Sequence, residues 1–209
     1  MAIRRRRRND LPMSSGPKIR CVELEPAHWP TLEALFGPNG ACGGCWCMWW
    51  RVPRGGALWR ETAGAPAKRT LRRLVSRGEA RGVLAFAGDD PVGWCAIGPR
   101  SDFPRVERVR ALAGAGADGV WSINCFYIPR AWRGRGVASA LLDAAIKACR
   151  RHGATIVEGY PVRPAADGKP TPGAFAWTGM LSMFEQRGFE PVREEKASKT
   201  LVRLRLQRT

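Results

Sequence analysis

The stretch from Val120 to Cys149 reads VWSINCFYIPRAWRGRGVASALLDAAIKAC and contains three kinds of local sequence in succession. The residues from Val120 to Ile128 are mostly apolar and favour a strand. Proline, arginine and glycine interrupt this pattern from Pro129 to Gly136, and apolar residues then recur at helical spacing from Val137 onward. The stretch therefore predicts a strand, a short basic loop and a helix.

The predicted helix has one apolar face and one polar face. Its apolar side chains recur at intervals of three and four residues, and the polar side chains fall between them. The apolar set is Val137, Ala138, Leu141, Leu142, Ala145, Ile146 and Cys149, and the polar set is Ser139, Asp143, Lys147 and Arg150. We expect the apolar face to pack on the core and the polar face to meet solvent.

The loop before this helix has the composition of an anion-binding site. Gly134 and Gly136 let backbone amides approach a bulky anion, because neither residue carries a Cβ atom. The start of a helix carries a partial positive charge, and Arg130, Arg133 and Arg135 add full charges. This composition predicts a diphosphate-binding loop, although a plain connection between strand and helix would account for the glycines alone.

A strand, a proline and R-x-x-G-x-A at the start of a long amphipathic helix resemble the acetyl-CoA-binding motif of the GNAT superfamily of N-acetyltransferases. Arg133, Gly136 and Ala138 occupy the fixed positions of that motif. Two other phosphate-binding patterns fit less well, because the chain has neither G-x-x-x-x-G-K-[ST] nor a G-x-G-x-x-G followed by an acidic residue about twenty positions later. A second segment, SMFEQRGF from Ser182 to Phe189, resembles the late helix of the same family, which ends in L-Y-E-K-x-G-F.

The resemblance covers roughly residues 18 to 207 and implies a mixed α/β fold, in which helices flank a central, splayed β-sheet of the α+β type. In this family two parallel strands separate, and the pantetheine arm of acetyl-CoA enters the gap; here they would be the strands at 120–128 and 154–160. The resemblance thus assigns binding of acetyl-CoA, the co-substrate, to the following residues: Phe126, Ile128, Arg133, Gly134, Arg135, Gly136, Val137 and Ala138.

Composition sets the limits of the domain. Residues 1–17 contain five consecutive arginines and no apolar periodicity, which predicts a disordered Arg-rich tail before a single domain at 18–209. No apolar run is long enough to span a membrane, and the first residues lack a secretory signal, so we expect a cytoplasmic protein without a membrane partner. The formal net charge of +17 also suits nucleic acid, but basic and aromatic residues do not interleave, so this partner is not favoured.

Further elements are predicted by periodicity and by turn residues. Strands are expected at 18–24, 80–87, 91–97, 189–192 and 199–206, and helices at 27–36, 67–78 and 174–187, with a short helix inside 99–116.

Residues 41–51, ACGGCWCMWWR, combine three cysteines with three tryptophans. A metal site would need ligands from distant residues, so we expect reduced thiols that pack as small hydrophobes, and no metal. The resemblance implies that this segment forms one wall of the acceptor site, lined by Trp46, Trp49 and Trp50. The alternative is that these tryptophans fill the core.

The family norm implies direct attack of an amine on the thioester in a ternary complex, with the oxyanion held by a backbone amide near Phe126 or Tyr127. The tyrosine that often serves as general acid in the family is Phe184 here. Either another group protonates the leaving sulfur, with Tyr160 as the candidate substitute, or the free thiolate departs, which a thiol pKa near about 8.5 allows. Glu158, an acidic residue in an apolar strand, is the candidate base; its alternative is an ion pair with a nearby cation. Cys125 is expected to pack rather than to act as a nucleophile.

The predicted function is therefore acetyl-CoA-dependent N-acetylation of a small-molecule or peptide amine. The alternative is a non-catalytic acyl-CoA- or nucleic-acid-binding module on the same fold. Association into a homodimer stays open, and the sequence does not identify the acceptor or the acyl chain preference.

Overall fold

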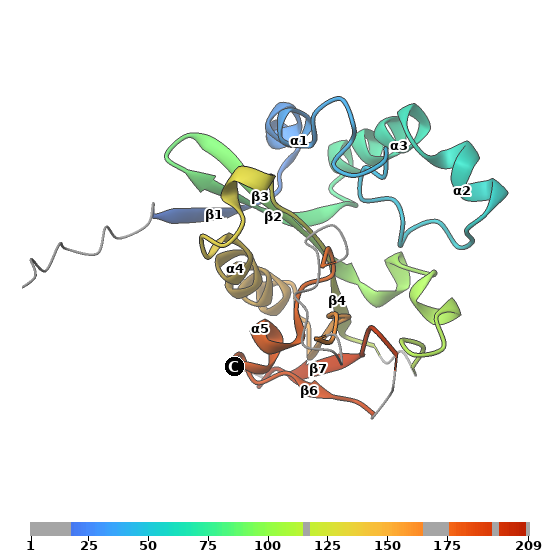
Figure 1. Cartoon of the computed structure of the whole chain (residues 1–209), viewed down its shortest axis with the longest axis vertical. Helices are drawn as coiled ribbons and strands as arrows, with labels where there is room; N and C mark the ends of the chain where they lie inside the picture. The colour runs from blue at the N-terminus through green and yellow to red at the C-terminus, as the bar shows by residue number, and fades with distance from the viewer. Residues whose placement is uncertain (1–17, 115–117, 165–175, 194–196, 208–209) are drawn as a thin grey trace, which may run out of the picture.

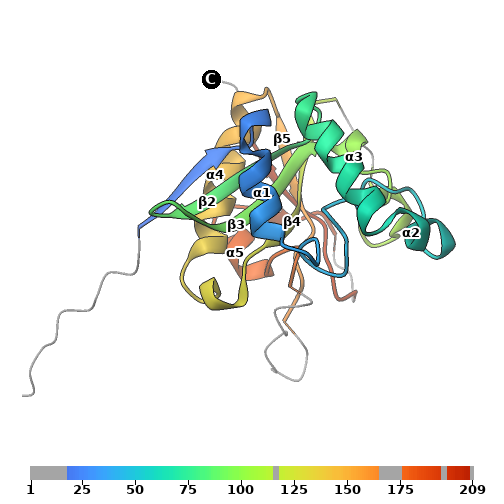
Figure 2. The ribbon, with the colours of Figure 1, turned by 90° about the horizontal axis from the view of Figure 1, so that it is seen from above.

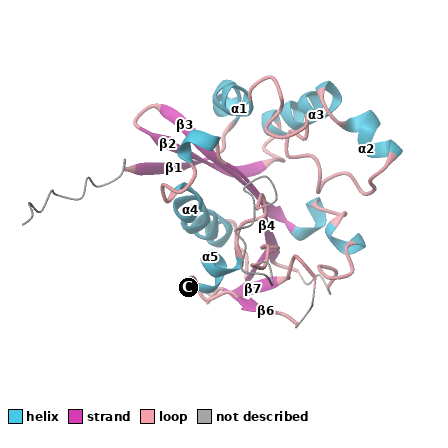
Figure 3. Cartoon of the chain, in the orientation of Figure 1, coloured by secondary structure: helices cyan, strands magenta, loops and turns pink. Residues whose placement is uncertain are grey.

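In the computed structural model, which describes residues 18–114, 118–164, 176–193 and 197–207, a seven-stranded mixed sheet has helices on both faces (Figures 1 and 3). The strands are β1 (Ile19–Glu23), β2 (Arg81–Ala87), β3 (Asp90–Pro99), β4 (Val120–Tyr127), β5 (Ile156–Gly159), β6 (Glu190–Pro191) and β7 (Val202–Arg205). The helices are α1 (Trp29–Phe36), α2 (Ala57–Thr62), α3 (Ala65–Ser76), α4 (Val137–Arg151) and α5 (Leu181–Glu185). Short 3₁₀ turns are η1 (Pro26–His28), η2 (Arg100–Asp102), η3 (Val106–Arg108) and η4 (Arg130–Trp132).

The strand order is β1-β2-β3-β4-β5-β7-β6, and every neighbouring pair is antiparallel except β4 and β5. These two strands are parallel because α4 connects them, as the sequence predicts. The mixed α/β class with a flanked central sheet is therefore confirmed.

Alternating side chains of the central strands supply two separate cores. Val83 and Ala85 of β2 face α4, whereas Leu84 and Phe86 face α1 and α3. Figure 2 shows this arrangement from above, with α1 and α3 on one side of the sheet and α4 on the other. We call these the α4 core and the α1 core.

Helix α4 begins where its sequence predicts, and a glycine flanks each of its ends. Gly136 precedes it in the left-handed region, with φ of 80°, and Gly153 follows it with φ of 82°. The apolar face lies in the α4 core, where Leu141, Leu142 and Ala145 are fully buried. The helix therefore presents its first turn at one end of the sheet, beside β4.

Strands β4 and β5 separate partway along their length. They pair from Val120 and Ile156 to Ile123 and Gly159, after which β5 ends and β4 continues to Tyr127. A register shift between β3 and β4 leaves Asn124 without a partner on β3, so β4 carries a bulge at this point. The bulge and the end of β5 leave one edge of β4 open beyond Ile123, and we call this opening the β4–β5 gap.

Two of the helix predictions differ from the structure, and one helix was not predicted. The helix expected at 174–187 comprises only α5, because Gly179 takes φ of 85° and packs against the Phe184 ring; residues 174 and 175 lie outside the described part. The short helix expected inside 99–116 consists of the two 3₁₀ turns η2 and η3. Helix α2 was not predicted, since its short sequence ALWRET has no clear apolar face.

The predicted tail at 1–17 lies outside the described residues, so its disorder stays a prediction. Within the described part of the chain, none of the helices combines the length and apolar character that crossing a bilayer requires.

Candidate active site

The loop between β4 and α4 has the geometry of an anion-binding site. Gly134 and Gly136 both take left-handed backbone angles, with φ of 71° and 80°, and a Cβ at either position would meet open space. Gly136 caps α4, and no side-chain hydrogen bond occupies this cap. The residues from Arg133 to Gly136 are exposed. The exposed glycines, the start of the helix and the adjacent arginines fit a diphosphate.

Three hydrogen bonds already occupy the open edge of β4. The indole nitrogen of Trp50 donates to the Asn124 carbonyl at 2.9 Å, and the Phe126 amide donates to the Trp177 carbonyl at 2.6 Å. Arg133 Nε donates to the Ile128 carbonyl at 3.1 Å. Because alternate residues of a strand direct their amide and carbonyl to the same side, the Phe126 carbonyl and the Ile128 amide also face this edge. An added strand would use the Phe126 carbonyl as a hydrogen-bond acceptor and the Ile128 amide as a donor.

Glu158, the candidate base, is fully buried between two arginines. Arg203 Nε donates to its Oε1 at 2.7 Å, and Arg100 Nη1 donates to its Oε2. These residues reach β5 from β7 and from η2, so their proximity is a product of the topology. The two cations engage both oxygens of the carboxylate in charge-assisted hydrogen bonds. The geometry favours the ion-pair alternative, and the role of base stays a prediction.

Tyr160, the candidate acid, belongs to the same buried network. Its hydroxyl lies 2.7 Å from Ser122 Oγ and 3.2 Å from Glu158 Oε2, and the side chain is fully buried. Burial is the main cause that raises the pKa of Tyr160 to about 12. The phenol is therefore neutral at ordinary pH, and its proton is directed into the network.

The three tryptophans assigned to the acceptor wall lie in different surroundings. Trp46 is buried in the α1 core against Trp29 and Phe36. Trp49 packs edge-on against Trp59 and beneath Arg105. Only Trp50 touches the open edge of β4, where its ring also packs against Tyr160 and Trp177.

The cysteines of the 41–51 segment diverge rather than converge. Cys42 is exposed, the Cys45 thiol contacts the Gly40 carbonyl at 3.6 Å, and Cys47 Sγ lies 3.5 Å from Cys125 Sγ. The hydrogen bond to Cys47, followed by burial, raises the pKa of Cys125 well above its usual value, so this thiol is a poor nucleophile. No group of three or more potential metal ligands occurs among the described residues.

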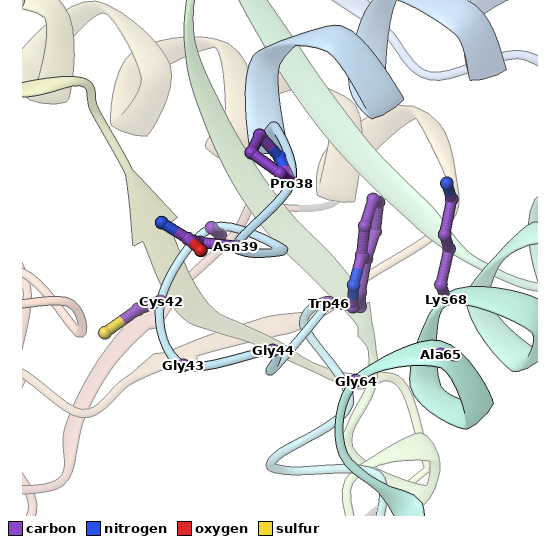
Figure 4. Close-up of a pocket in the computed structure, with 10 residues that line it drawn as sticks. Pro38, Asn39, Cys42, Gly43, Gly44, Trp46, Gly64, Ala65 and Lys68 are labelled. Carbon is purple, nitrogen blue, oxygen red and sulfur yellow. The ribbon is translucent and has the colours of Figure 1, made fainter.

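The same segment borders an open cavity of about 590 Å³ on the side of α3 (Figure 4). Trp46 and the aliphatic chain of Lys68 stand side by side along it, and Lys68 Nζ lies 5.2 Å from the Trp46 ring centre. Lys68 also pairs with Glu33 at 2.5 Å, so its charge is already balanced. This cavity is separate from the loop before α4.

Two residues near the gap were missed by the sequence analysis. Asn124 is 1% exposed, and its Nδ2 has no hydrogen-bond partner in the described part of the chain; a lone amide in an apolar strand is the signal that could have identified it. Lys199 donates from Nζ to Thr178 Oγ1 at 2.9 Å and lies over the Trp177 ring. Its sequence offers no comparable signal, because cations are frequent throughout this chain.

A splayed sheet with a glycine-rich, basic loop at the start of the following helix defines an acyltransferase site. Residues 47–165 match the family of acetyltransferases called GNAT, and this match includes more than half of the chain. The chain belongs to the GNAT acetyltransferase family, which confirms the predicted resemblance and the predicted class of enzyme.

Solved structures share the fold at low sequence identity. The PaiA N-acetyltransferase of Thermoplasma acidophilum, in complex with coenzyme A, has a TM-score of 0.51 and 14% identity over 90% of this chain and 99% of that one. The GNAT domain of PAT from S. lividans has a TM-score of 0.52 and 17% identity, with 90% of each chain covered. The acetyltransferase yncA from Salmonella typhimurium, with acetyl-CoA, has a TM-score of 0.52 and 13% identity over 91% and 95%. No curated protein sequence matched.

Proposed function

We propose that this protein transfers the acetyl group of acetyl-CoA to an amine by direct attack in a ternary complex. The observation that carries the proposal is the position of the Arg133–Gly136 loop, whose two left-handed glycines open onto the start of α4 directly beside the β4–β5 gap. An anion-binding loop and an open strand edge are the two features that a nucleotide diphosphate and its amide-bearing pantetheine arm require.

The donor site divides between the loop and the strand. The amides of the first turn of α4, with Arg133 and Arg135, would hold the diphosphate. The pantetheine arm would pair with the Phe126 carbonyl and the Ile128 amide, since the other outward groups of this edge have partners. The complexes of PaiA with coenzyme A and of yncA with acetyl-CoA support acetyl-CoA as the donor, and the residues that hold it here are part of the proposal.

The acceptor would approach from the face that carries Trp50. This ring forms an apolar wall at the gap, and the buried Asn124 amide beside it offers a hydrogen-bond donor that has no partner among the described residues. Such a site suits an amine whose remaining structure is partly apolar and carries one oxygen acceptor. Trp46 is buried in the α1 core, and Trp49 packs against Trp59 and Arg105, so neither is assigned to the same wall.

Catalysis would depend on position more than on covalent chemistry. Holding the amine against the thioester carbonyl removes most of the entropic cost of the encounter. The network of Glu158, Arg100, Arg203 and Tyr160 would keep β5 and the gap rigid, because the buried Glu158 carboxylate accepts hydrogen bonds from all three other residues.

An acceptor screen tests the proposal. Purified protein with acetyl-CoA is offered primary amines of three kinds, namely small aliphatic and aromatic amines, amino acids and peptides with free N-termini, and released thiol is measured. We expect at least one class to produce thiol above the rate without acceptor. Acetyl-CoA binding without thiol release in any class would favour the non-catalytic alternative.

A further inference from the structure

Lys199 lies across the β4–β5 gap from the thioester-binding edge. The chain that leaves β5 continues beside it, because Val162 forms an antiparallel bridge with Lys199 and the Thr200 amide donates to the Pro161 carbonyl at 3.1 Å. Lys199 therefore extends the β5 side of the gap, whereas Phe126 belongs to the β4 side.

Trp177 contacts both sides of the gap. Its carbonyl accepts the hydrogen bond of the Phe126 amide, and its ring centre lies 4.8 Å from Lys199 Nζ. Trp177 thus lies between the amine of Lys199 and Phe126 of β4. The family resemblance locates the acetyl group near this position of the strand.

The surroundings of Lys199 Nζ favour its charged form but leave that charge without a balancing anion. The amine donates to Thr178 Oγ1 at 2.9 Å and faces the π surface of Trp177, and both contacts stabilise an ammonium. No carboxylate pairs with it in the described part of the chain. Burial nevertheless lowers the pKa of Lys199 to about 8, and Cys125 is the titratable group whose charge acts on it.

We propose that Lys199 is the proton donor to the coenzyme A thiolate that leaves during acetyl transfer. The proposal rests on the proposed acetyltransferase function. The acceptor amine forms a bond to the thioester carbon, the carbon–sulfur bond breaks with its electron pair on sulfur, and the Lys199 ammonium gives that sulfur its proton. Neutral Lys199 is then reprotonated from the solvent, which has received the proton lost by the acceptor.

Two observations make Lys199 suited to this step. Phe184 stands where the family often has its tyrosine, and the Tyr160 hydroxyl is engaged by Ser122 and Glu158. A donor whose pKa of about 8 is close to the value of a thiol, about 8.5, transfers its proton with little change in free energy. Lys199 therefore supplies an acid that the other residues of the gap do not.

The test compares the affinities of coenzyme A and acetyl-CoA by calorimetry between about pH 6.5 and about pH 9.5, a range that spans the thiol pKa. Only coenzyme A carries a thiol, so the ratio of the two affinities reports its ionisation in the complex. An adjacent ammonium lowers the pKa of the bound thiol, but Lys199 itself loses its charge above about pH 8. Coenzyme A should therefore gain about twofold over acetyl-CoA near about pH 8, for a coupling of about one pKa unit between the two groups, and this gain should fade again by about pH 9.5.

Lys199→Met should abolish this gain while acetyl-CoA still binds within about threefold of the wild type, which also checks that the variant is folded. Lys199→Arg should instead give a gain that persists and reaches about tenfold by about pH 9.5, because its guanidinium stays charged. Lys147→Met, which removes one charge from the exposed face of α4, should behave as the wild type.

An identical ratio of the two affinities in the wild type and in Lys199→Met at every pH would overturn the inference about Lys199 but not the proposed function. Failure of the wild type to bind either compound would overturn the proposed donor site, and the inference with it.

Discussion

The Phe126 amide donates a hydrogen bond to the Trp177 carbonyl at 2.6 Å and so joins the open edge of β4 to the segment before α5. The family resemblance assigns the oxyanion to a backbone amide near Phe126 or Tyr127, so this amide is one of the candidates. A thioester oxygen can use it only if the Trp177 carbonyl moves away or shares it. The contact between these two residues therefore sets how the donor and the reaction centre are arranged, and several predictions depend on the groups around it.

Replacing Trp50 with Phe removes the indole N–H that the Asn124 carbonyl accepts. The carbonyl would then be buried without a partner, and the smaller ring would pack less well, so we expect the free energy of unfolding to fall by about 2 kcal/mol. Urea denaturation measures this loss. Trp49→Phe is the control and should cost less than about 1 kcal/mol, because Trp49 is only partly buried. Equal losses of unfolding free energy in the two variants would show that the hydrogen bond from Trp50 to the Asn124 carbonyl adds no measurable stability.

Glu158→Gln separates a structural role from a catalytic one. The substitution leaves Arg100 and Arg203 facing a neutral amide in the core, and we expect the free energy of unfolding to fall by about 3–5 kcal/mol. Glu107→Gln is the matched control: it also faces Arg100, but its side chain is 49% exposed, so the loss should stay below about 1 kcal/mol. A Glu158→Gln protein of undiminished stability that has lost acetyl transfer would instead identify Glu158 as the base.

Lys199 should make stability depend on pH. Its pKa is about 8 in the folded protein and near 10.5 in the unfolded chain, so between these values the unfolded state binds more protons and stability rises with pH. The stability attributable to Lys199 is thus present above pH 10.5 and is lost as the pH falls through 8.

Lys199→Met should therefore gain stability over the wild type at about pH 7, and this advantage should shrink toward about pH 10. Urea denaturation in reducing buffer at both pH values measures the difference, and the thiols common to both proteins cancel. Lys147→Met should show no such trend. A difference in stability between Lys199→Met and the wild type that stays constant with pH would mean that folding does not lower the pKa of Lys199.

Alkylation of the thiols tests the surroundings of the 41–51 segment. Cys42 is exposed, whereas Cys47, Cys95 and Cys149 are buried, so Cys42 should react at least about tenfold faster than these three. Mass spectrometry of a time course with iodoacetamide measures each rate. Equal protection of Cys42, Cys45 and Cys47, removed by a chelator, would reveal a bound metal instead.

The strand, loop and helix around residues 120–149 could be predicted because their signals are local. The periodicity of α4, the glycines at both of its ends and the apolar run of β4 each depend on neighbours in sequence. The two motifs of the family added the topology. Local signals were insufficient for α5, because Gly179 takes a left-handed angle and packs against Phe184, and the helix begins only at Leu181.

The residues of the site were less predictable than the loop that binds the donor. Glu158 stood out as a carboxylate in an apolar strand, but Arg100 and Arg203, which decide its chemistry, come from distant segments. Lys199 acquires its place at the gap through the bridge to Val162 and the contact with Trp177, both of which lie far from it in sequence. Such contacts depend on tertiary packing, and a single sequence carries no pattern for them.

The most direct test of the central claim is calorimetric titration with acetyl-CoA of the wild type, Gly136→Trp and Gly153→Trp. Both glycines flank α4, both have left-handed angles of 80° and 82°, and a Cβ at either would meet open space, so the two substitutions bring similar strain. Only Gly136 borders the proposed diphosphate loop. We expect micromolar binding to the wild type and to Gly153→Trp, and a loss of at least about tenfold in Gly136→Trp. Equal binding by the three proteins, or none by the wild type, would contradict the donor site.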